Sequence, residues 1–483
     1  MTSFQQRVLA MKHGWILFGV VIGALALRLV LFWEMSASGD PQRFQSQDSG
    51  GYIAVAQSLL QGELWSTGTA RTPGYPLLLI PGILLKRVIT VTVSLQILLS
   101  CLTVVLTYRL GLSVFRNRRI ALLSAALFAI EPLSVFFSNL LLTETLFLIV
   151  FTAFLLQFLK SLQSGSALDF LTAGCLLGVT AYVRPATYYL PLFLLIIAVL
   201  GWLVGRLLGK RLQFPFPIKS MLVMCMAAHA TMGLWQVRNY AIAHYSGFSS
   251  ISEINLYYYH AGATIAVRDH RSFQAVYDEF TNAKEKLTPS EMKAKALVIL
   301  RDNPICYARA YLKGTIKTLF GILTAPVQCL SPRVMEEIRT IWRGPAGQQA
   351  QHEEARSTQG VVGVSHGIAG KAIQSGRLLW KDKVLVAWLA YSIAVSYGIY
   401  ILFGIFLWHG VRRKCNFECE NAGLKITMLL GVIVYVLAVT GPAAVGFDGR
   451  FRLPFMPILS CFAGFGMWIT LKACAPRLTG KSE

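Results

Sequence analysis

Long apolar runs separated by short polar connections dominate the hydrophobic pattern of this chain. The runs cover residues 13–33, 88–108, 120–137, 143–160, 167–183, 186–205, 220–237, 384–409, 425–441 and 454–472. About 20 apolar residues in a helix rise about 30 Å, the thickness of the hydrocarbon core of a bilayer. The pattern therefore predicts an all-α polytopic membrane protein with about ten transmembrane helices.

The first apolar run also allows another interpretation, because small residues in the sequence MSASGD follow it, as they do at a signal-peptide cleavage site. The run is longer than the hydrophobic region of a typical signal peptide. We therefore expect residues 13–33 to be an uncleaved signal anchor.

Two connections are long, residues 34–87 and residues 238–383. Within the first, a helix is expected directly after Ser49, because five apolar residues recur on one helical face. These are Tyr52, Val55, Ala56, Leu59 and Leu60. A dozen residues cannot span a bilayer, so this helix is expected to lie in the membrane interface. The apolar stretch that follows Arg71 is interrupted by three prolines and predicts a second interfacial segment.

The second long connection carries a clear helix start. Thr288 can be the N-cap, with Pro289 at the first helical position and Glu291 completing a capping box. Another amphipathic helix is expected from Asn303 and Pro304 through Lys317. Residues 344–370 are rich in Gly, Gln, Ser and His without periodicity, which predicts a mobile loop. No internal repeat is evident, so residues 1–483 are expected to form one transmembrane domain.

Composition and charge support this interpretation. The chain is 55% hydrophobic and only 14% charged, whereas soluble domains carry about 25% charged residues. Its 45 Lys and Arg against 23 Asp and Glu give a net charge of +22. The basic residues concentrate in alternate short connections, which predicts that both termini are cytoplasmic and both long connections lie on the opposite face. The positive charge is thus a topology signal and does not indicate nucleic-acid binding.

Candidate chemistry gathers at the predicted outer ends of the spans, whereas a proton-coupled transporter would place acids or histidines mid-span. The charged residues at these ends are Arg28, Glu144, Arg184, Arg238, Arg450 and Arg452, and Asp48 and Arg71 lie in the first outer loop. Arginines bind phosphate through bidentate hydrogen bonds, and a nearby carboxylate can accept a proton from an attacking hydroxyl. This combination suits glycosyl transfer from a polyprenyl-phosphate-linked sugar.

Six short sequences resemble, in order, those of family 39-type glycosyltransferases of the GT-C fold, such as the aminoarabinose transferase of lipid A and the protein O-mannosyltransferases. They are DSGGY at 48–52, RTPGYPL at 71–77, LTETLF at 142–147, GVTAYVRP at 178–185, WQVRNY at 235–240 and GRFRLPFMP at 449–457. The resemblance implies a GT-C fold with a catalytic Asp at Asp48, a second acid at Glu144 and a phosphate-binding residue at Arg71. Family members often carry a second acid directly after the first, where this chain has Ser49.

Each candidate acid has a structural alternative. Asp48 can be a general base or merely the N-cap of the interfacial helix. Glu144 can orient the acceptor or Asp48, or simply favour the dipole of the fourth span. Arg71 can bind the donor phosphate or anchor to lipid headgroups.

The remaining candidates have similar alternatives. Arg184 can bind phosphate or snorkel to the interface. Arg450 and Arg452 lie two residues apart, so on an extended segment they point the same way. This favours one or both facing the donor over anchoring in the interface. Possible supporting residues are Arg28, Tyr52, Arg238 and Asn239, of which Arg28 can pair within the bundle and Asn239 can cap a helix. His260 is expected to be a loop or core residue, and Tyr257 to Tyr259 can stack on sugars or anchor in the interface.

The sequence therefore predicts an inverting glycosyltransferase that moves a sugar from a polyprenyl-phosphate donor to an acceptor hydroxyl. The acceptor can be a glycolipid, a glycan or a protein. No cofactor is required by these residues; a divalent metal is possible but not indicated, and the CxxxC pair Cys415 and Cys419 lacks further ligands. The expected location is a bacterial inner membrane with the active site facing the periplasm.

Three alternatives remain open. A ligase or polymerase would use a longer lipid-linked glycan on the same fold. A flippase or transporter of lipid-linked sugars would share an arginine-rich phosphate site but usually has internal repeats. A noncatalytic scaffold would not depend on Asp48 or Glu144.

Overall fold

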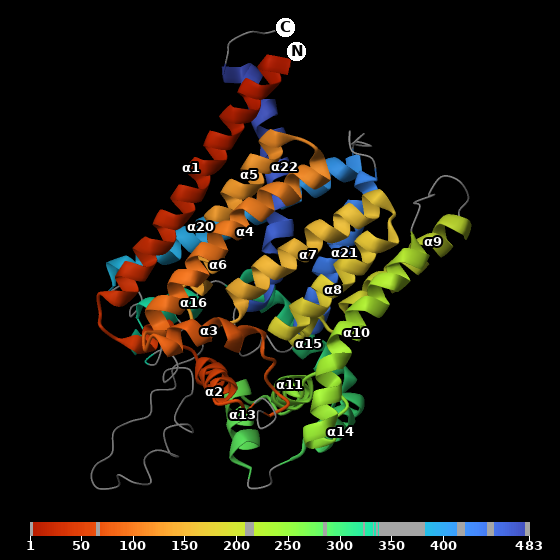
Figure 1. The fold of residues 1–483 in the computed structure, drawn as a ribbon. Coiled ribbons are helices and arrows are strands. Elements are labelled where there is room, and N and C mark those ends of the chain that lie inside the picture. Colours follow the sequence, from red (N-terminus) through yellow and green to blue (C-terminus); the bar gives the residue numbers. More distant parts are fainter. Residues whose placement is uncertain are drawn as a thin grey trace. The chain divides into compact units, whose positions relative to one another are not determined.

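The computed structural model describes residues 3–63, 68–207, 217–283, 287–321, 324–331, 333–334, 337, 382–412, 421–441 and 449–478. Within these ranges the regular elements are helices (Figure 1). Contacts divide the chain into two compact units. Unit 1 comprises Met1–Ile251, Ala394–Val439 and Arg452–Glu483, and unit 2 comprises Ser252–Ile393 and Thr440–Phe451. The predicted loop at 344–370 lies outside the described residues.

Unit 1 holds the long apolar helices, and residues 383–393 of α20, Thr440 of α21 and residues 450–451 of η6 are assigned to unit 2. The elements of unit 1 are α1 (Ser3–Ser36), η1 (Pro41–Phe44), α2 (Ser49–Leu60), α3 (Gly74–Leu84), α4 (Val88–Phe115), α5 (Arg118–Ala129), α6 (Pro132–Phe137), α7 (Glu144–Ser164), α8 (Ala167–Val183), η2 (Pro185–Thr187), α9 (Leu190–Leu207), α10 (Ile218–Ala243), α20 (Lys383–Arg412), α21 (Ala422–Thr440), η6 (Arg450–Phe455) and α22 (Met456–Leu478). In the described part of the chain, eight helices are long and apolar enough to cross a bilayer. This confirms the prediction of a polytopic α-helical membrane protein.

The predicted continuous span at 120–137 is wrong, because the structure breaks it between α5 and α6. Pro132 opens α6, where its missing N–H and its ring prevent α5 from continuing. Glu131 is the N-cap of α6, and its carboxylate accepts a hydrogen bond of 2.6 Å from the backbone N–H of Ser134. Glu131 is fully buried, so the interior of unit 1 contains an acid that we did not expect.

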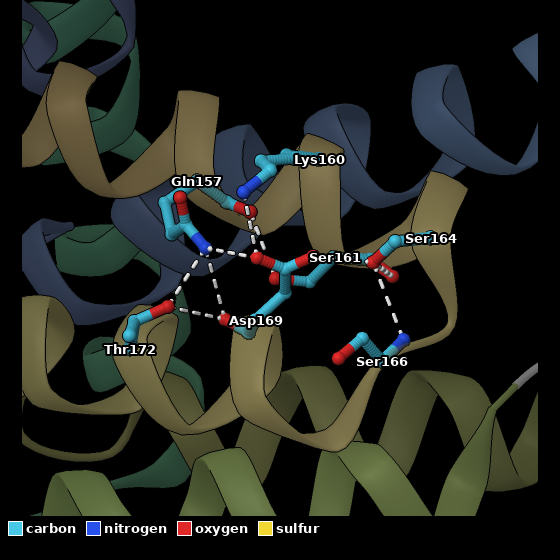
Figure 2. A network of polar contacts seen from close by, with 7 residues as sticks. All are labelled: Gln157, Lys160, Ser161, Ser164, Ser166, Asp169 and Thr172. Atoms are coloured by element: carbon cyan, nitrogen blue, oxygen red, sulfur yellow. Dashed lines mark hydrogen bonds and ion pairs between the residues drawn. The ribbon is translucent and has the colours of Figure 1, made fainter.

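Helices α7 and α8 form an antiparallel hairpin that a polar network closes at its turn (Figure 2). The carboxylate of Asp169 on α8 accepts hydrogen bonds from Lys160 at 2.8 Å and Ser164 at 2.7 Å. Gln157 adds a bond to Thr172 at 2.7 Å. Because the hairpin is closed here, the first residue of α7 and the last residue of α8 meet at its other end.

Small residues allow α8 to approach α10 closely. A Cβ added to Gly174 would overlap the carbonyl oxygen of Met224, and one added to Gly178 would overlap Thr231. Such close backbone approach is typical of helix packing in membranes. At the far end of α4, the buried Lys425 of α21 donates to the carbonyl oxygen of Ser113 at 3.0 Å, which fixes α21 to α4.

The described part of unit 2 consists of short helices. They are α11 (Ile251–Asn255), which starts at the unit boundary, the π-helix η4 (Leu256–Ala261), α12 (Gly262–Arg268), α13 (Phe273–Asn282), α14 (Pro289–Asp302), α15 (Pro304–Phe320) and α16 (Thr324–Leu330). The predicted capping box is confirmed, because Thr288 and Glu291 exchange side-chain to backbone hydrogen bonds at the start of α14.

Aromatic residues gather around the π-helix of unit 2. The ring of Tyr257 stacks on Phe280 with 4.6 Å between centroids, and Tyr259 stacks on Phe273 at 5.9 Å. Nδ1 of His260 lies 3.3 Å from the hydroxyl of Tyr307. Burial lowers the pKa of His260 to about 4, so the imidazole is neutral at pH 7, as expected of a core histidine.

Candidate functional site

Asp48 and Arg71 form an ion pair at the start of the first predicted outer loop. Nη2 of Arg71 lies 2.7 Å from Oδ1 of Asp48, and about a quarter of each side chain is exposed, 25% and 28% respectively. Nη1 of Arg71 also donates to the hydroxyl of Tyr52 at 3.0 Å. A solute can therefore reach a carboxylate and a guanidinium that lie side by side.

The alternative role of Asp48 as a helix cap does not fit its geometry. Asp48 occupies the N-cap position of α2, yet it has helical backbone angles, and its side chain makes no capping hydrogen bond. A capping residue normally has extended angles and accepts a bond from the second or third N–H of the helix. The Asp48 carboxylate instead binds Arg71.

Glu144 and Arg184 form a second ion pair, at the open end of the α7–α8 hairpin. Glu144 is the first residue of α7, and Arg184 directly follows α8. Nη1 of Arg184 donates to Oε1 of Glu144 at 3.0 Å. The Glu144 side chain is 0% exposed and that of Arg184 is 13% exposed, so this acid is far less accessible than Asp48.

Two tyrosines, Tyr52 and Tyr75, connect the two ion pairs. The Tyr52 ring packs edge-on against that of Tyr75, with 5.1 Å between centroids. Burial, with smaller contributions from the charge of Glu144 and from Tyr52, holds the pKa of Tyr75 well above its usual value. The closeness of α3 to α8 supports this arrangement, since a Cβ on Gly74 would lie 2.5 Å from the carbonyl oxygen of Tyr182. The two acid–arginine pairs thus belong to one cluster.

Arg238 binds the loop that carries Arg71, and Asn239 binds a neighbouring segment of backbone. Arg238 donates to the carbonyl oxygen of Gly68 at 3.3 Å. Asn239 donates to the carbonyl oxygens of Gly247 and Phe248, at 3.0 and 2.9 Å. Both residues lie inside α10, which extends to Ala243, so Asn239 does not cap the start of a helix.

The residues that follow the segment bound by Asn239 are hydrogen-bonded to the loop that carries Arg71. The Ser249 hydroxyl donates to the carbonyl oxygen of Ala70 at 2.6 Å, and the Ser250 N–H donates to that of Thr69 at 3.1 Å. Because Ala70 directly precedes Arg71, Arg238 and Asn239 support the position of Arg71 through these bonds.

Gln96, which the sequence did not single out, and Ser49 bind the loop before Glu144. This segment, residues 138–143, is buried and non-helical and is called the 138–143 loop below. Nε2 of Gln96 donates to the carbonyl oxygens of Leu140 and Ser138 at 2.7 and 3.2 Å. The Ser49 hydroxyl donates to that of Leu141 at 2.9 Å. A lone Gln within an apolar span was the only sequence signal for this role.

Arg28 is fully buried within unit 1. Its guanidinium donates to Ser100, to Ser134 and to the carbonyl oxygens of Ala24 and Ala129, at 2.8 to 3.1 Å. These bonds join α1 to α4 and to the α5–α6 break. Arg28 therefore pairs within the bundle, which was one of its two predicted roles.

Arg452 and Arg450 do not share an extended segment, so the expectation that they face the same way is wrong. Residues Arg450–Phe455 form the 3-10 helix η6, in which residues two apart point in different directions. Arg452 is fully buried, donates to Ser396 at 3.0 Å and lies near Tyr400. Arg450 belongs to unit 2.

Among the described residues, no three His, Cys, Asp or Glu side chains gather into a group that could hold a metal ion. At position 49, where a second acid often stands in the family, the Ser49 hydroxyl is fully buried against the 138–143 loop. The acids that the structure brings into the cluster, Asp48 and Glu144, each bind an arginine.

Comparisons with known proteins agree with this architecture. Residues 72–235 match the family described as dolichyl-phosphate-mannose-protein mannosyltransferase. The matched region begins directly after Arg71 and contains Glu144 and Arg184. A search of curated proteins found no match.

Among solved structures, the chain is similar to the archaeal oligosaccharyltransferase AglB from Archaeoglobus fulgidus, in complex with an inhibitory peptide and a dolichol-phosphate. The TM-score is 0.50 and the identity 11%. The similarity covers 100% of this chain but 53% of AglB, so the chain spans about half the length of that protein. At this identity the similarity shows the fold alone.

The chain thus has the fold of AglB, and residues 72–235 resemble the mannosyltransferase family. This confirms the predicted fold class and the resemblance that the short sequences indicated.

Proposed function

We propose that this protein transfers a sugar from a polyprenyl-phosphate-linked donor to an acceptor hydroxyl at the outer face of the membrane. The observation that carries the proposal is the partly exposed Asp48–Arg71 pair beside the buried Glu144–Arg184 pair. It combines a proton acceptor with cations suited to a phosphate leaving group. The matched mannosyltransferase family and the dolichol-phosphate bound by AglB support a lipid-linked donor.

In the proposed reaction, the Asp48 carboxylate accepts the proton of the acceptor hydroxyl. The hydroxyl oxygen forms a bond to the anomeric carbon, the bond from that carbon to the phosphate oxygen breaks, and its electron pair leaves on the polyprenyl phosphate. This in-line displacement inverts the anomeric configuration. Arginine stabilises the charge that develops on the phosphate, so the leaving group needs no proton.

The Asp48–Arg71 pair is more exposed than the Glu144–Arg184 pair, so we assign different roles to the two arginines and the two acids. Arg71 is accessible and adjacent to the base, so it is the first phosphate ligand. Arg184 is the second, held in place by Glu144, which is too deeply buried to serve as the base for an incoming acceptor. Arg452 is assigned no phosphate contact, because it is buried against Ser396 and Tyr400.

The test is sugar transfer by purified full-length protein in lipid nanodiscs, supplied with radiolabelled polyprenyl-phosphate sugars and a membrane extract as acceptor source. Asp48→Asn should lower transfer by at least about 100-fold, the contribution of a general base. Asp40→Asn is a matched control in the same predicted loop, because Asp40 is partly exposed and caps only η1. It should retain full transfer.

Other outcomes would replace the proposal. Full transfer by folded Asp48→Asn would remove Asp48 as the base. Movement of lipid-linked sugar across the bilayer of sealed proteoliposomes, without transfer, would indicate a flippase. The anomeric configuration of the product, determined by NMR, tests inversion separately.

A further inference from the structure

Gln96 is a fully buried amide on α4, in the interior of a predicted span. An amide in apolar surroundings destabilises the protein unless its donors and acceptor are paired. Its Oε1 accepts a hydrogen bond from the Tyr75 hydroxyl at 2.8 Å. Its Nε2 donates to the carbonyl oxygens of Leu140 and Ser138. One side chain thus joins three elements: α3, α4 and the 138–143 loop.

Each of these bonds leads to one of the two ion pairs. Tyr75 packs edge-on against Tyr52, whose hydroxyl accepts a hydrogen bond from Arg71. On the other side, Leu140 lies four residues before Glu144, which binds Arg184. Gln96 is therefore the one residue described here that is hydrogen-bonded both to the tyrosine beside the Asp48–Arg71 pair and to the loop that ends at Glu144.

The 138–143 loop depends on such bonds for its conformation. Non-helical backbone at membrane depth must find hydrogen-bond partners within the protein, because water and lipid tails supply none there. Gln96 pairs two of the loop's carbonyl oxygens, and without its amide the loop would have to move to find other partners. Movement of the loop would shift Glu144 and Arg184 relative to Asp48.

We propose that Gln96 is a positioning residue that sets the placement of the Glu144–Arg184 pair relative to the Asp48–Arg71 pair. The inference rests on the proposed function, in which the base and the phosphate ligands act on one substrate. Transfer requires the hydroxyl, the anomeric carbon and the leaving oxygen in line, and a displacement of about 1 Å can lower such a rate about 100-fold.

Two variants separate the bonds of Gln96. Gln96→Met removes all three, and Gln96→Glu keeps an acceptor for Tyr75 but loses both N–H donors. Both should lower kcat by about 10- to 100-fold and change the donor KM less than about threefold. Tyr75→Phe, which removes one bond, should cost less, and its effect should not multiply with that of Gln96→Met.

Lys425→Met is the matched control for general destabilisation. Lys425 is as buried as Gln96 and also donates to a backbone carbonyl oxygen, that of Ser113 at the other end of α4. Ser113 lies 17 residues from Gln96, or about 25 Å along the helix. It should lower Tm as Gln96→Met does while leaving kcat within about twofold. If the two variants lost kcat equally at equal Tm, Gln96 would have only a structural role.

Amide hydrogen exchange provides a readout that does not depend on activity. In Gln96→Met, peptides covering residues 138–147 should exchange at least about tenfold faster than in wild type, and in Lys425→Met they should not. Unchanged exchange together with full kcat would overturn the inference. A wild-type protein that transfers no sugar would overturn the proposed function alone, since exchange still decides whether Gln96 fixes this loop.

Discussion

The Ser49 hydroxyl donates a 2.9 Å hydrogen bond to the carbonyl oxygen of Leu141, although 92 residues separate them in the chain. Ser49 also accepts a bond from the N–H of Ser46 at 2.9 Å. Ser49 directly follows Asp48, and Leu141 lies three residues before Glu144. This bond is thus a short physical connection between the two acids of the site.

The bond predicts that the acid often found at this position in the family is not tolerated here. Ser49→Glu would place a carboxylate against the Leu141 carbonyl oxygen in a fully buried site, which should destabilise the protein by several kcal/mol. Ser49→Ala removes both hydrogen bonds of this hydroxyl, to Leu141 and from Ser46, and should cost about 1–3 kcal/mol.

Thermal unfolding of both variants in nanodiscs measures these effects. Ser58, also on α2, forms a suitable control, because Ser58→Ala lies on a partly exposed part of the helix. A stable Ser49→Glu protein with increased activity would show that the family acid has a catalytic place in this chain after all.

The sequence correctly predicted the elements that depend on interactions between residues close together in the chain. The helix after Ser49 begins and ends where the spacing of Tyr52 and Ala56 placed it, because these residues form its buried face. The capping box at Thr288 formed as expected, since its bonds join residues three apart. The resemblance brought Asp48, Arg71, Glu144 and Arg184 together as candidates, and the structure places them in one cluster.

Long-range side-chain partners were not predictable in this way. The periodicity of an apolar span does not tell whether a lone Gln96 faces lipid or a distant loop. The break at Glu131 had a signal, an acid followed by proline, but the apolar residues around it favoured a continuous helix. The directions of Arg450 and Arg452 depended on local backbone conformation, which the sequence did not determine.

Asn239 should affect donor binding without touching the donor. Asn239→Ala removes two hydrogen bonds to the segment that holds Ala70, so Arg71 should lose its fixed position. We expect the donor KM to rise about tenfold with a smaller change in kcat.

Steady-state kinetics with varied polyprenyl-phosphate sugar tests this effect. Gln236→Ala is the control, because Gln236 binds the same segment at Ser246, which makes no bond to the Arg71 loop among those described. An Asn239→Ala protein with an unchanged KM would show that Arg71 is positioned independently of α10.

Acid should weaken unit 2 through His260. Burial lowers the pKa of His260 to about 4, below the value of about 6.5 in an unfolded chain. Between these values the unfolded chain binds more protons than the folded one, so the free energy of unfolding falls as the pH decreases from 6.5 to 4. The full difference is about 3 kcal/mol.

Thermal midpoints measured from pH 7 to pH 4 test this dependence. His260→Asn should flatten the acid side of the profile, and His270→Asn, which changes an exposed histidine of the same unit, should not. If His260→Asn kept the wild-type profile, other groups would account for the loss of stability in acid.

The Glu144–Arg184 pair should behave as a buried ion pair, unlike the pair at the other end of the same hairpin. Arg184→Met leaves the fully buried Glu144 carboxylate without its arginine and should cost about 3–5 kcal/mol. Adding Glu144→Gln should restore most of that stability, because the buried charge is gone, but not transfer, because the phosphate ligand is still missing.

Lys160→Met is the control. It breaks the Lys160–Asp169 pair, in which Lys160 is 66% exposed, and should cost at most about 1 kcal/mol with full activity. Thermal unfolding and transfer assays on the wild type and these three variants separate the effect on stability from the effect on phosphate binding. Recovery of transfer in the double variant would exclude Arg184 as a phosphate ligand.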